Sequence, residues 1–200
     1  MEKIKHFKFC LVIVNSKLDQ KRCVRRLSKN KLISMLRECG AIKFGSFILT
    51  SGAKSDYYID IKKASADPKI LKTIARFIAE YAKGYDIIAG MELGAVPLAV
   101  AVSLEVGKPF VIIRKEKKEH GTGKLIEGLD VSQKRVLLVE DVTTTGGSVV
   151  KAIKCLRENK AMVDRVVTVV DRLSGAKERL KEMDVELISL LDVNDILEKR

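Results

Sequence analysis

The sequence predicts an α/β protein with a mostly parallel, twisted sheet, flanking helices and a small hood subdomain. Segments typical of strands and of helices alternate along the chain, as they do in parallel sheets joined by right-handed crossovers. The strand segments are short, continuous apolar runs, which are typical of strands covered on both faces. The 200 residues, 46% of them hydrophobic, fit one domain with a full-sized core.

The first residues of the chain are strongly basic. Residues 1–31 contain ten Lys or Arg and two acids, so they carry +8 of the formal net charge of +12. We interpret residues 1–27 as a basic N-terminal extension and residues 28–200 as the folded domain. A basic arm can attract nucleic acid or anionic surfaces. A solvated tail is the favoured interpretation, because no aromatic stacking pattern or helix-turn-helix accompanies the charges, and nucleic acid is not an expected partner.

An apolar run, Phe7 to Val14, lies within this extension and resembles the core of a signal peptide. It is short and no small-residue cleavage site follows it, so a short strand or docking segment is expected instead. No apolar run reaches the roughly 18 residues that cross a bilayer. The cysteines are scattered and there are only two histidines, which favours free thiols over disulfides or a zinc site. We therefore expect a soluble, cytoplasmic protein.

The folded domain begins with a helix and a hairpin. A 3.6-residue apolar period follows Ser28, a possible N-cap, and Gly40 closes the helix. Residues 41–60 contain short β-prone pieces separated by glycines, which predicts a hairpin or hood laid over the sheet. Asp67 and Pro68 then form the cap and first residue of a second helix. Its buried face is predicted to contain Ile70, Leu71, Ile74, Phe77, Ile78 and Tyr81.

The remaining chain alternates strands with helices. The predicted strands are Asp86–Ala89, Phe110–Ile113, Val136–Val139, Val166–Val170 and Glu186–Leu191. The predicted helices are Val96–Glu105, a helix ending at about Asn159, and one starting at Ser174. The long polar connection over residues 114–130 has no apolar periodicity, and such connections are commonly lids or binding loops.

The most informative stretch is Arg135 to Ser148. Its apolar strand ends in two carboxylates, Glu140 and Asp141, and a hydroxyl- and glycine-rich turn then leads into a helix. Amides at the start of a helix favour an anion, so the order of parts predicts a phosphate site beside a sugar-binding acid pair. Neither a nucleoside triphosphatase loop nor a dinucleotide fingerprint is present. An ordinary crossover with solvated acids explains the apolar run but not the acids followed by six small or hydroxyl residues.

The polar connection gathers cations around one imidazole. Arg114, Lys115, Lys118 and His120 lie in it, and Gly121 and Gly123 can act as hinges. A mobile cationic lid suits a polyanion whose charge grows during reaction. Taken by itself, the segment fits a run of solvated charges as well as it fits a lid.

Together these motifs resemble the type I phosphoribosyltransferases, and among them the orotate phosphoribosyltransferase family. The resemblance extends from about Ser28 to Leu191. It rests on the acid pair with its Thr/Gly loop and on Arg-Lys-x-x-Lys-x-His-Gly-x-Gly from Arg114. It also rests on the hood pattern over 47–60 and on Gly90 to Pro97, similar to the family's diphosphate-side loop.

The resemblance implies transfer of ribose 5-phosphate from phosphoribosyl diphosphate (PRPP) to orotate, giving orotidine 5′-monophosphate and diphosphate in UMP biosynthesis. The catalytic residues would be Lys115, Lys118, His120 and Asp141. The PRPP site would comprise Arg114, Lys115, Lys118, His120, Glu140, Asp141, Val142, Thr143, Thr144, Thr145, Gly146, Gly147 and Ser148. Orotate would contact Thr144, Arg172 and Tyr58. The alternative for Arg172 is a surface pair with Asp171.

The family resemblance also implies a cofactor and a partner. Mg²⁺ would bind mainly through the diphosphate, with no metal site of the protein's own. Lys115 would reach the site of the neighbouring subunit in a homodimer. One departure from the family pattern is Thr50, at a hood position often occupied by Lys; Lys54 is the candidate substitute.

Two other functions share parts of the pattern. A purine or uracil phosphoribosyltransferase has the PRPP stretch, but the lid over 114–123 and Arg172 suit an acidic base. A phosphoribosyltransferase-like transcriptional regulator would use the basic arm for nucleic acid, and the complete lid favours the enzyme.

Overall fold

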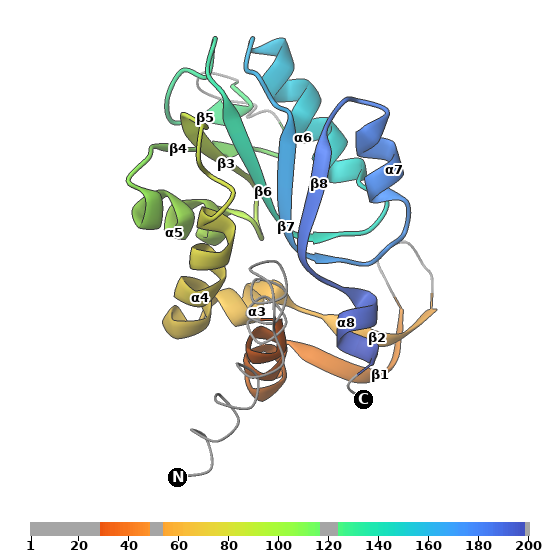
Figure 1. The fold of residues 1–200 in the computed structure, drawn as a ribbon. Helices are drawn as coiled ribbons and strands as arrows, with labels where there is room; N and C mark the ends of the chain where they lie inside the picture. The colour runs from red at the N-terminus through yellow and green to blue at the C-terminus, as the bar shows by residue number, and fades with distance from the viewer. Residues whose placement is uncertain (1–28, 49–53, 117–123, 199–200) are drawn as a thin grey trace, which may run out of the picture.

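The computed structural model describes residues 29–48, 54–116 and 124–198. A six-stranded sheet forms its centre (Figure 1), in the order β5-β4-β3-β6-β7-β8. The strands are β3 (Ile87–Met91), β4 (Phe110–Ile113), β5 (Ile126–Glu127), β6 (Val136–Thr143), β7 (Arg165–Asp171) and β8 (Glu186–Asp192). All adjacent pairs are parallel except β4 with β5. The predicted mostly parallel α/β fold is confirmed.

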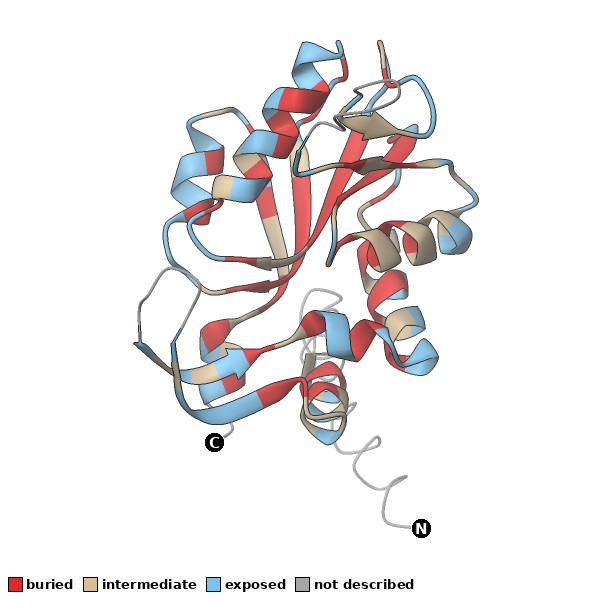
Figure 2. Ribbon diagram, turned by 180° about the vertical axis from the view of Figure 1, so that it is seen from behind, coloured by how far each residue is buried: buried red, intermediate tan, exposed pale blue. Residues whose placement is uncertain are grey.

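Helices lie on both faces of the sheet, and strand alternation divides the core between them. Ile88 and Leu137 face a cluster formed with a helix over residues 29–38 and with α4 (Pro68–Ala79) and α5 (Val96–Val106). Their neighbours Ile87 and Leu138 face α6 (Gly147–Glu158) and α7 (Ala176–Lys181). Successive side chains of a strand point to opposite faces, so one apolar run supplies both clusters. The helices expose their outer sides (Figure 2).

The hood is an antiparallel hairpin at the end of the sheet where α8 (Val193–Leu197) follows β8 (Figure 1). Its strands are β1 (Ile42–Ile48) and β2 (Lys54–Ile59), and α3 (Ile61–Ser65) joins β2 to α4. The predicted hairpin is confirmed, and Gly40 ends the preceding helix with a φ of 69°. Asp67 caps α4 by accepting hydrogen bonds from two backbone N–H groups, and Pro68 follows it as expected.

Strand β6 differs from its predicted bounds. The apolar run suggested an end at Val139, but the strand continues through both acids to Thr143. Pairing with β7 explains the extension, because Thr143 lies opposite Asp171 at the end of that strand. The elements β5, α3 and α8 had no counterpart in the sequence interpretation.

Several predictions concern residues that the structure does not describe. The apolar run Phe7–Val14, the proposed boundary at residue 28 with its cap Ser28, and the hood residue Thr50 lie outside the described ranges. Within those ranges, none of the helices has the length and apolar character needed to span a bilayer.

Candidate functional site

A pocket of about 390 Å³ lies at the carboxyl ends of β3 and β6. This is where ligands bind on parallel sheets. It brings together the predicted acid pair, one lid lysine and the loop after β3. The residues that line it are Lys62, Met91, Glu92, Leu93, Gly94, Lys115, Glu140, Asp141, Val142 and Ser148.

Glu140 and Asp141 differ in burial although they are neighbours. Glu140 is 6% exposed, and burial together with the adjacent Asp141 carboxyl raises its pKa well above the ordinary carboxyl value. The positive charge of Lys115 opposes this rise in the pKa of Glu140. Asp141 is half-buried, so its carboxylate is the more accessible acid of the pair.

The loop after β3 approaches the acid pair closely. A Cβ atom at Gly94 would lie 2.0 Å from the Asp141 Oδ2 atom, so only glycine leaves room for that carboxylate. On the other side of the pocket, the Glu92 carboxylate accepts a 2.8 Å hydrogen bond from the backbone N–H of Lys115. The β3 loop therefore contacts both the acid pair and the start of the predicted lid.

The predicted phosphate loop leads from β6 into α6. Thr144, Thr145 and Ser148 are exposed, and Gly146 adopts a φ of 76° just before the helix begins at Gly147. The N-terminal turn of a helix presents unpaired N–H groups, which can bind a phosphate. A Cβ atom at Gly146 would lie 3.3 Å from atoms of Ala176, so the loop packs closely against the start of α7.

The structure tests the position of only part of the lid. Lys115 lies at the rim of its own chain's pocket, whereas Lys118 and His120 lie outside the described residues. The Arg114 guanidinium lies 4.0 Å from the Glu127 carboxylate and is not among the pocket-lining groups. The roles assigned to these residues stay predictions.

Arg172 extends from the end of β7 to the hood. Its guanidinium donates to the Ser55 hydroxyl at 3.1 Å and to the Tyr57 hydroxyl at 3.3 Å, and it stacks on the Tyr57 ring. Asp171 instead accepts hydrogen bonds from Thr143 and from the backbone of Leu173. The arrangement differs from the alternative of a surface Arg172–Asp171 pair.

The two tyrosines of β2 point to opposite sides of the hairpin. Tyr57 contacts Arg172, whereas Tyr58 is 38% exposed and stacks on Phe47 with ring centroids 5.6 Å apart. The structure therefore brings Tyr57 to Arg172, and the predicted contact of Tyr58 with orotate stays a prediction. Side chains alternate between the two faces of a strand, so Ser55 and Tyr57 lie on the same face. This alternation is the signal in the sequence that groups Tyr57 with Ser55.

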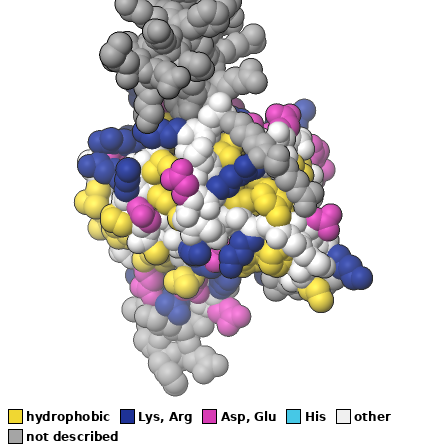
Figure 3. All heavy atoms as spheres, turned by 90° about the horizontal axis from the view of Figure 1, so that it is seen from below, with side chains coloured by type: hydrophobic (Ala, Val, Ile, Leu, Met, Phe, Trp, Pro, Cys, Tyr) yellow, Lys and Arg dark blue, Asp and Glu magenta, His cyan; other side chains and the backbone are white. Residues whose placement is uncertain are grey.

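The end of the molecule that carries the hood mixes basic and apolar groups. Lys and Arg side chains lie among hydrophobic ones on this face (Figure 3). The exposed hydrophobic residues of the hairpin include Phe44 and Ile48, and the Arg37 guanidinium lies over the Phe44 ring. Arg37 on Phe44 and Arg172 on Tyr57 are thus two contacts between a cation and an aromatic ring of the hood.

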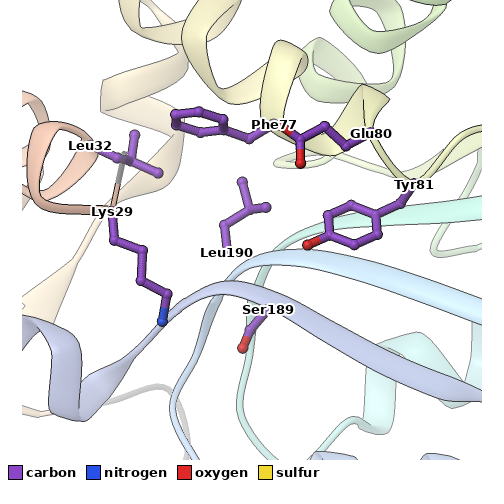
Figure 4. Close-up of a pocket in the computed structure, with 7 residues that line it drawn as sticks. All are labelled: Lys29, Leu32, Phe77, Glu80, Tyr81, Ser189 and Leu190. Carbon is purple, nitrogen blue, oxygen red and sulfur yellow. The ribbon is translucent and has the colours of Figure 1, made fainter. Parts of the chain in front are cut away.

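A second pocket, of about 40 Å³, lies between the helix over 29–38, α4 and β8 (Figure 4). Phe77, Tyr81 and Leu190 give it an apolar lining, and Lys29 beside it forms a 2.6 Å ion pair with Asp195. It contains none of the predicted site residues. A third pocket, of about 550 Å³, is lined by residues 124–131 and Asn159 and also contains none of them, so the strand-end pocket is the candidate active site.

The pocket contains one residue that sequence reasoning did not identify. Lys62 lines the strand-end pocket from α3, but it belongs to no motif and no local signal marks it. Among the described residues, no group of three or more His, Cys, Asp or Glu side chains is arranged to hold a metal ion.

Comparisons with known proteins agree with this geometry. Residues 60–195 match the family model for the phosphoribosyl transferase domain. The orotate phosphoribosyltransferase of Methanocaldococcus jannaschii is 55% identical over 169 residues, which cover 84% of this chain and 96% of that protein.

Solved structures give the same assignment. The orotate phosphoribosyltransferase of Aeropyrum pernix superposes with a TM-score of 0.72 at 34% identity, covering 84% of this chain and 97% of the other. The Mycobacterium tuberculosis orotate phosphoribosyltransferase in complex with PRPP has a TM-score of 0.71 at 31% identity, covering 84% and 98%. The chain therefore belongs to the phosphoribosyl transferase family and, within it, to the orotate phosphoribosyltransferases.

Proposed function

We propose that the protein transfers ribose 5-phosphate from PRPP to orotate, giving orotidine 5′-monophosphate and diphosphate for UMP biosynthesis. The observation that carries the proposal is the pocket that joins the acid pair, the loop after β3 and the start of α6. The M. tuberculosis relative binds PRPP, which supports the same ligand here.

Each part of the site has a role in this reaction. Glu140 and Asp141 would bind the ribose hydroxyls, and Thr143 to Ser148 would bind the 5′-phosphate through backbone N–H and hydroxyl groups. Arg172, held by Ser55 and Tyr57, would bind the orotate carboxylate with its planar guanidinium. Thr144 and Tyr58 would complete the base site.

The chemical step replaces diphosphate by N1 of orotate at the anomeric carbon. Breaking the bond to diphosphate builds positive charge on the sugar and negative charge on the leaving group. Arg114, Lys115, Lys118 and His120 would surround that anion and exclude water, which would otherwise hydrolyse PRPP.

Magnesium fits the donor set of the pocket. Mg²⁺, a hard cation that prefers oxygen ligands, would be held mainly by the oxygens of the diphosphate, and the Asp141 carboxylate lines the same pocket. When bound, the ion would neutralise part of the diphosphate charge. Glu92 and Glu140 add further carboxylate oxygens to the same pocket.

A homodimer is part of the proposal, with Lys115 acting in the partner's site. The support is α5, a mostly apolar helix in which only Leu98, Ala99 and Val102 are buried. Leu93 before the helix is 72% exposed and Leu104 within it is 80% exposed. Such an uncovered apolar face is typical of an interface. A cytoplasmic location is also proposed, and the free thiols of Cys39 and Cys155 suit a reducing compartment.

One assay tests the activity. Purified protein is incubated with PRPP, Mg²⁺ and, in separate reactions, orotate, uracil, hypoxanthine or adenine. We expect product with orotate. Turnover of another base in its place would identify a different phosphoribosyltransferase. Absence of turnover, with salt-sensitive nucleic-acid binding that is lost on deleting residues 1–27, would support a regulator instead.

A further inference from the structure

A lysine outside every motif reaches the candidate active site. Lys62 lines the strand-end pocket together with the acid pair and the β3 loop. It comes from α3, the short helix that links the hood to α4. The pocket therefore has a cation on its hood side as well as Lys115 on its lid side.

The backbone of Lys62 is fixed, whereas its side chain is exposed enough to meet a ligand. Ile61, directly before it, and Ala64, two residues after it, are fully buried, and Asp60 caps the helix by accepting from the backbone N–H of Lys63. The Lys62 side chain is 54% exposed, and its Nζ atom lies 3.9 Å from the Asp60 carboxylate. An exposed ion pair at that distance contributes little free energy, so exchanging Asp60 for a ligand phosphate costs little.

The pocket is lined by acids, so binding the negatively charged PRPP there requires cations, and the β3 loop supplies none. Glu92, Glu140 and Asp141 are acidic, and the β3 loop residues that line the pocket include no base. PRPP brings a phosphate and a diphosphate into this acidic site. Among the described lining residues, the bases are Lys62 and Lys115. If Lys115 serves the partner subunit, Lys62 is the lining base that remains with its own pocket.

We propose that Lys62 is a diphosphate-binding residue that acts within its own subunit, holding the diphosphate of PRPP from the hood side. This assignment rests on the proposed function and adds a residue to it. Because α3 follows closely after β2, which carries the Arg172 contacts, the hood would bind both substrates: the base through Arg172 and the diphosphate through Lys62.

The adjacent lysine provides a matched control. Lys63 belongs to the same short helix, but its side chain extends to Gly40, where a Cβ atom would lie 2.9 Å from the Lys63 Nζ atom. Lys62→Ala and Lys63→Ala therefore remove the same charge from adjacent positions, and only the first removes it from the pocket. Lys62→Arg keeps the charge.

The experiment measures steady-state kinetics with PRPP and orotate, and binding of inorganic diphosphate with Mg²⁺ by calorimetry, on full-length protein. For Lys62→Ala we expect the KM for PRPP and the Kd for diphosphate to rise by about 10-fold or more, as for loss of a hydrogen bond to a charged group. The KM for orotate should stay unchanged. Lys63→Ala should match the wild type, and Lys62→Arg should restore most of the affinity.

The outcomes separate this inference from the proposed function. If the wild type turns over orotate but Lys62→Ala binds diphosphate as tightly as Lys63→Ala, the Lys62 assignment is wrong and the function stands. A rise confined to the KM for orotate would also overturn it. If the wild type fails to use orotate at all, the proposed function fails, and the diphosphate titration still reports on Lys62.

Discussion

The hydroxyl of Thr143 donates a 3.1 Å hydrogen bond to the buried carboxylate of Asp171, and this bond ties the ends of β6 and β7 together. The backbone adds a second link, because the N–H of Arg172 donates to the carbonyl of Thr143 at 2.9 Å. The phosphate loop begins directly after Thr143, and Arg172 directly follows Asp171. The predicted phosphate and base sites are therefore anchored at one point.

Replacing Asp171 should destabilise this anchor. Asp171→Ala leaves the Thr143 hydroxyl and the N–H of Leu173 without their acceptor in a buried site, where the residue itself is 3% exposed. We expect the free energy of unfolding in urea to fall by about 2–4 kcal/mol, from two unsatisfied groups. Asp171→Asn keeps one oxygen acceptor and should lose less. Equal stability of the alanine variant and the wild type would contradict the anchoring role.

The sequence predicted the layers of the fold because the strands are short apolar runs separated by recognisable helix starts. Strand β4 has the predicted bounds Phe110–Ile113, and α4 begins at the predicted cap and proline. It did not predict the end of β6, because Glu140 and Asp141 interrupt the apolar run. Pairing with β7 keeps them in the strand, and pairing partners cannot be read from a local window.

The short helices illustrate two different reasons for a missed element. Helix α8 carries a capping box between Asp192 and Asp195, a local signal that was present in the sequence. Helix α3 has only five residues, and packing against α4 and β6 supports it. Lys62 could not be identified as a pocket residue because its position depends on that packing.

Arg172 should determine affinity for orotate more than for PRPP. We expect Arg172→Ala to raise the KM for orotate by about 10- to 100-fold, as for loss of a charge-assisted hydrogen bond, with a smaller effect on the KM for PRPP. Arg172→Lys should restore only part of the affinity, since an ammonium cannot stack on Tyr57 or bind a carboxylate with two parallel hydrogen bonds.

A second arginine on the same strand is the control for this experiment. Arg165 lies at the opposite end of β7, where it forms a 2.7 Å ion pair with Glu186. Arg165→Ala should leave both KM values unchanged. If Arg172→Ala behaves like Arg165→Ala, the base site lies elsewhere in the molecule.

Lys115 should contribute to the rate of the chemical step. Losing one preorganised donor to the departing diphosphate raises the barrier by about 3–4 kcal/mol, by analogy with oxyanion-hole deletions. We expect Lys115→Ala to lower kcat strongly, with the urea-unfolding midpoint unchanged because the side chain is exposed. Lys134→Ala, an exposed lysine just before the amino end of β6, is the control. Near-normal turnover of Lys115→Ala would remove Lys115 from the lid.

Mixed dimers test which pocket Lys115 serves. In one chain, Lys115 lies at the rim of its own pocket, and its backbone N–H bonds to Glu92. If it acts in the partner's site, a hybrid of Lys115→Ala and Asp141→Ala subunits has one site with both residues intact. Mixing the two inactive variants should then restore part of the activity. Subunit exchange shown by mass spectrometry, without recovery of activity, would assign Lys115 to its own pocket.

The buried acid of the pair should make stability depend on pH. Burial and the neighbouring Asp141 raise the pKa of Glu140 above its ordinary value of 4.5. Between that value and the raised one, the folded protein binds a proton that the unfolded chain releases. The stabilisation from the protonated form is therefore fully present below the ordinary value and is lost as pH rises through the raised pKa.

Glu140→Gln removes this dependence, because the amide stays neutral at every pH. We expect the ligand-free variant to gain stability over the wild type in urea unfolding as pH rises from about 4.5 to neutrality, since burial disfavours the charged carboxylate. Glu158→Gln, at an exposed site near the end of α6, should show no such trend. The same Glu140→Gln change should weaken PRPP binding, because an amide nitrogen replaces one of the two carboxyl oxygens that can accept hydrogen bonds from the ribose hydroxyls. A stability difference that stays constant with pH would mean that Glu140 ionises normally and that the acid pair is solvated.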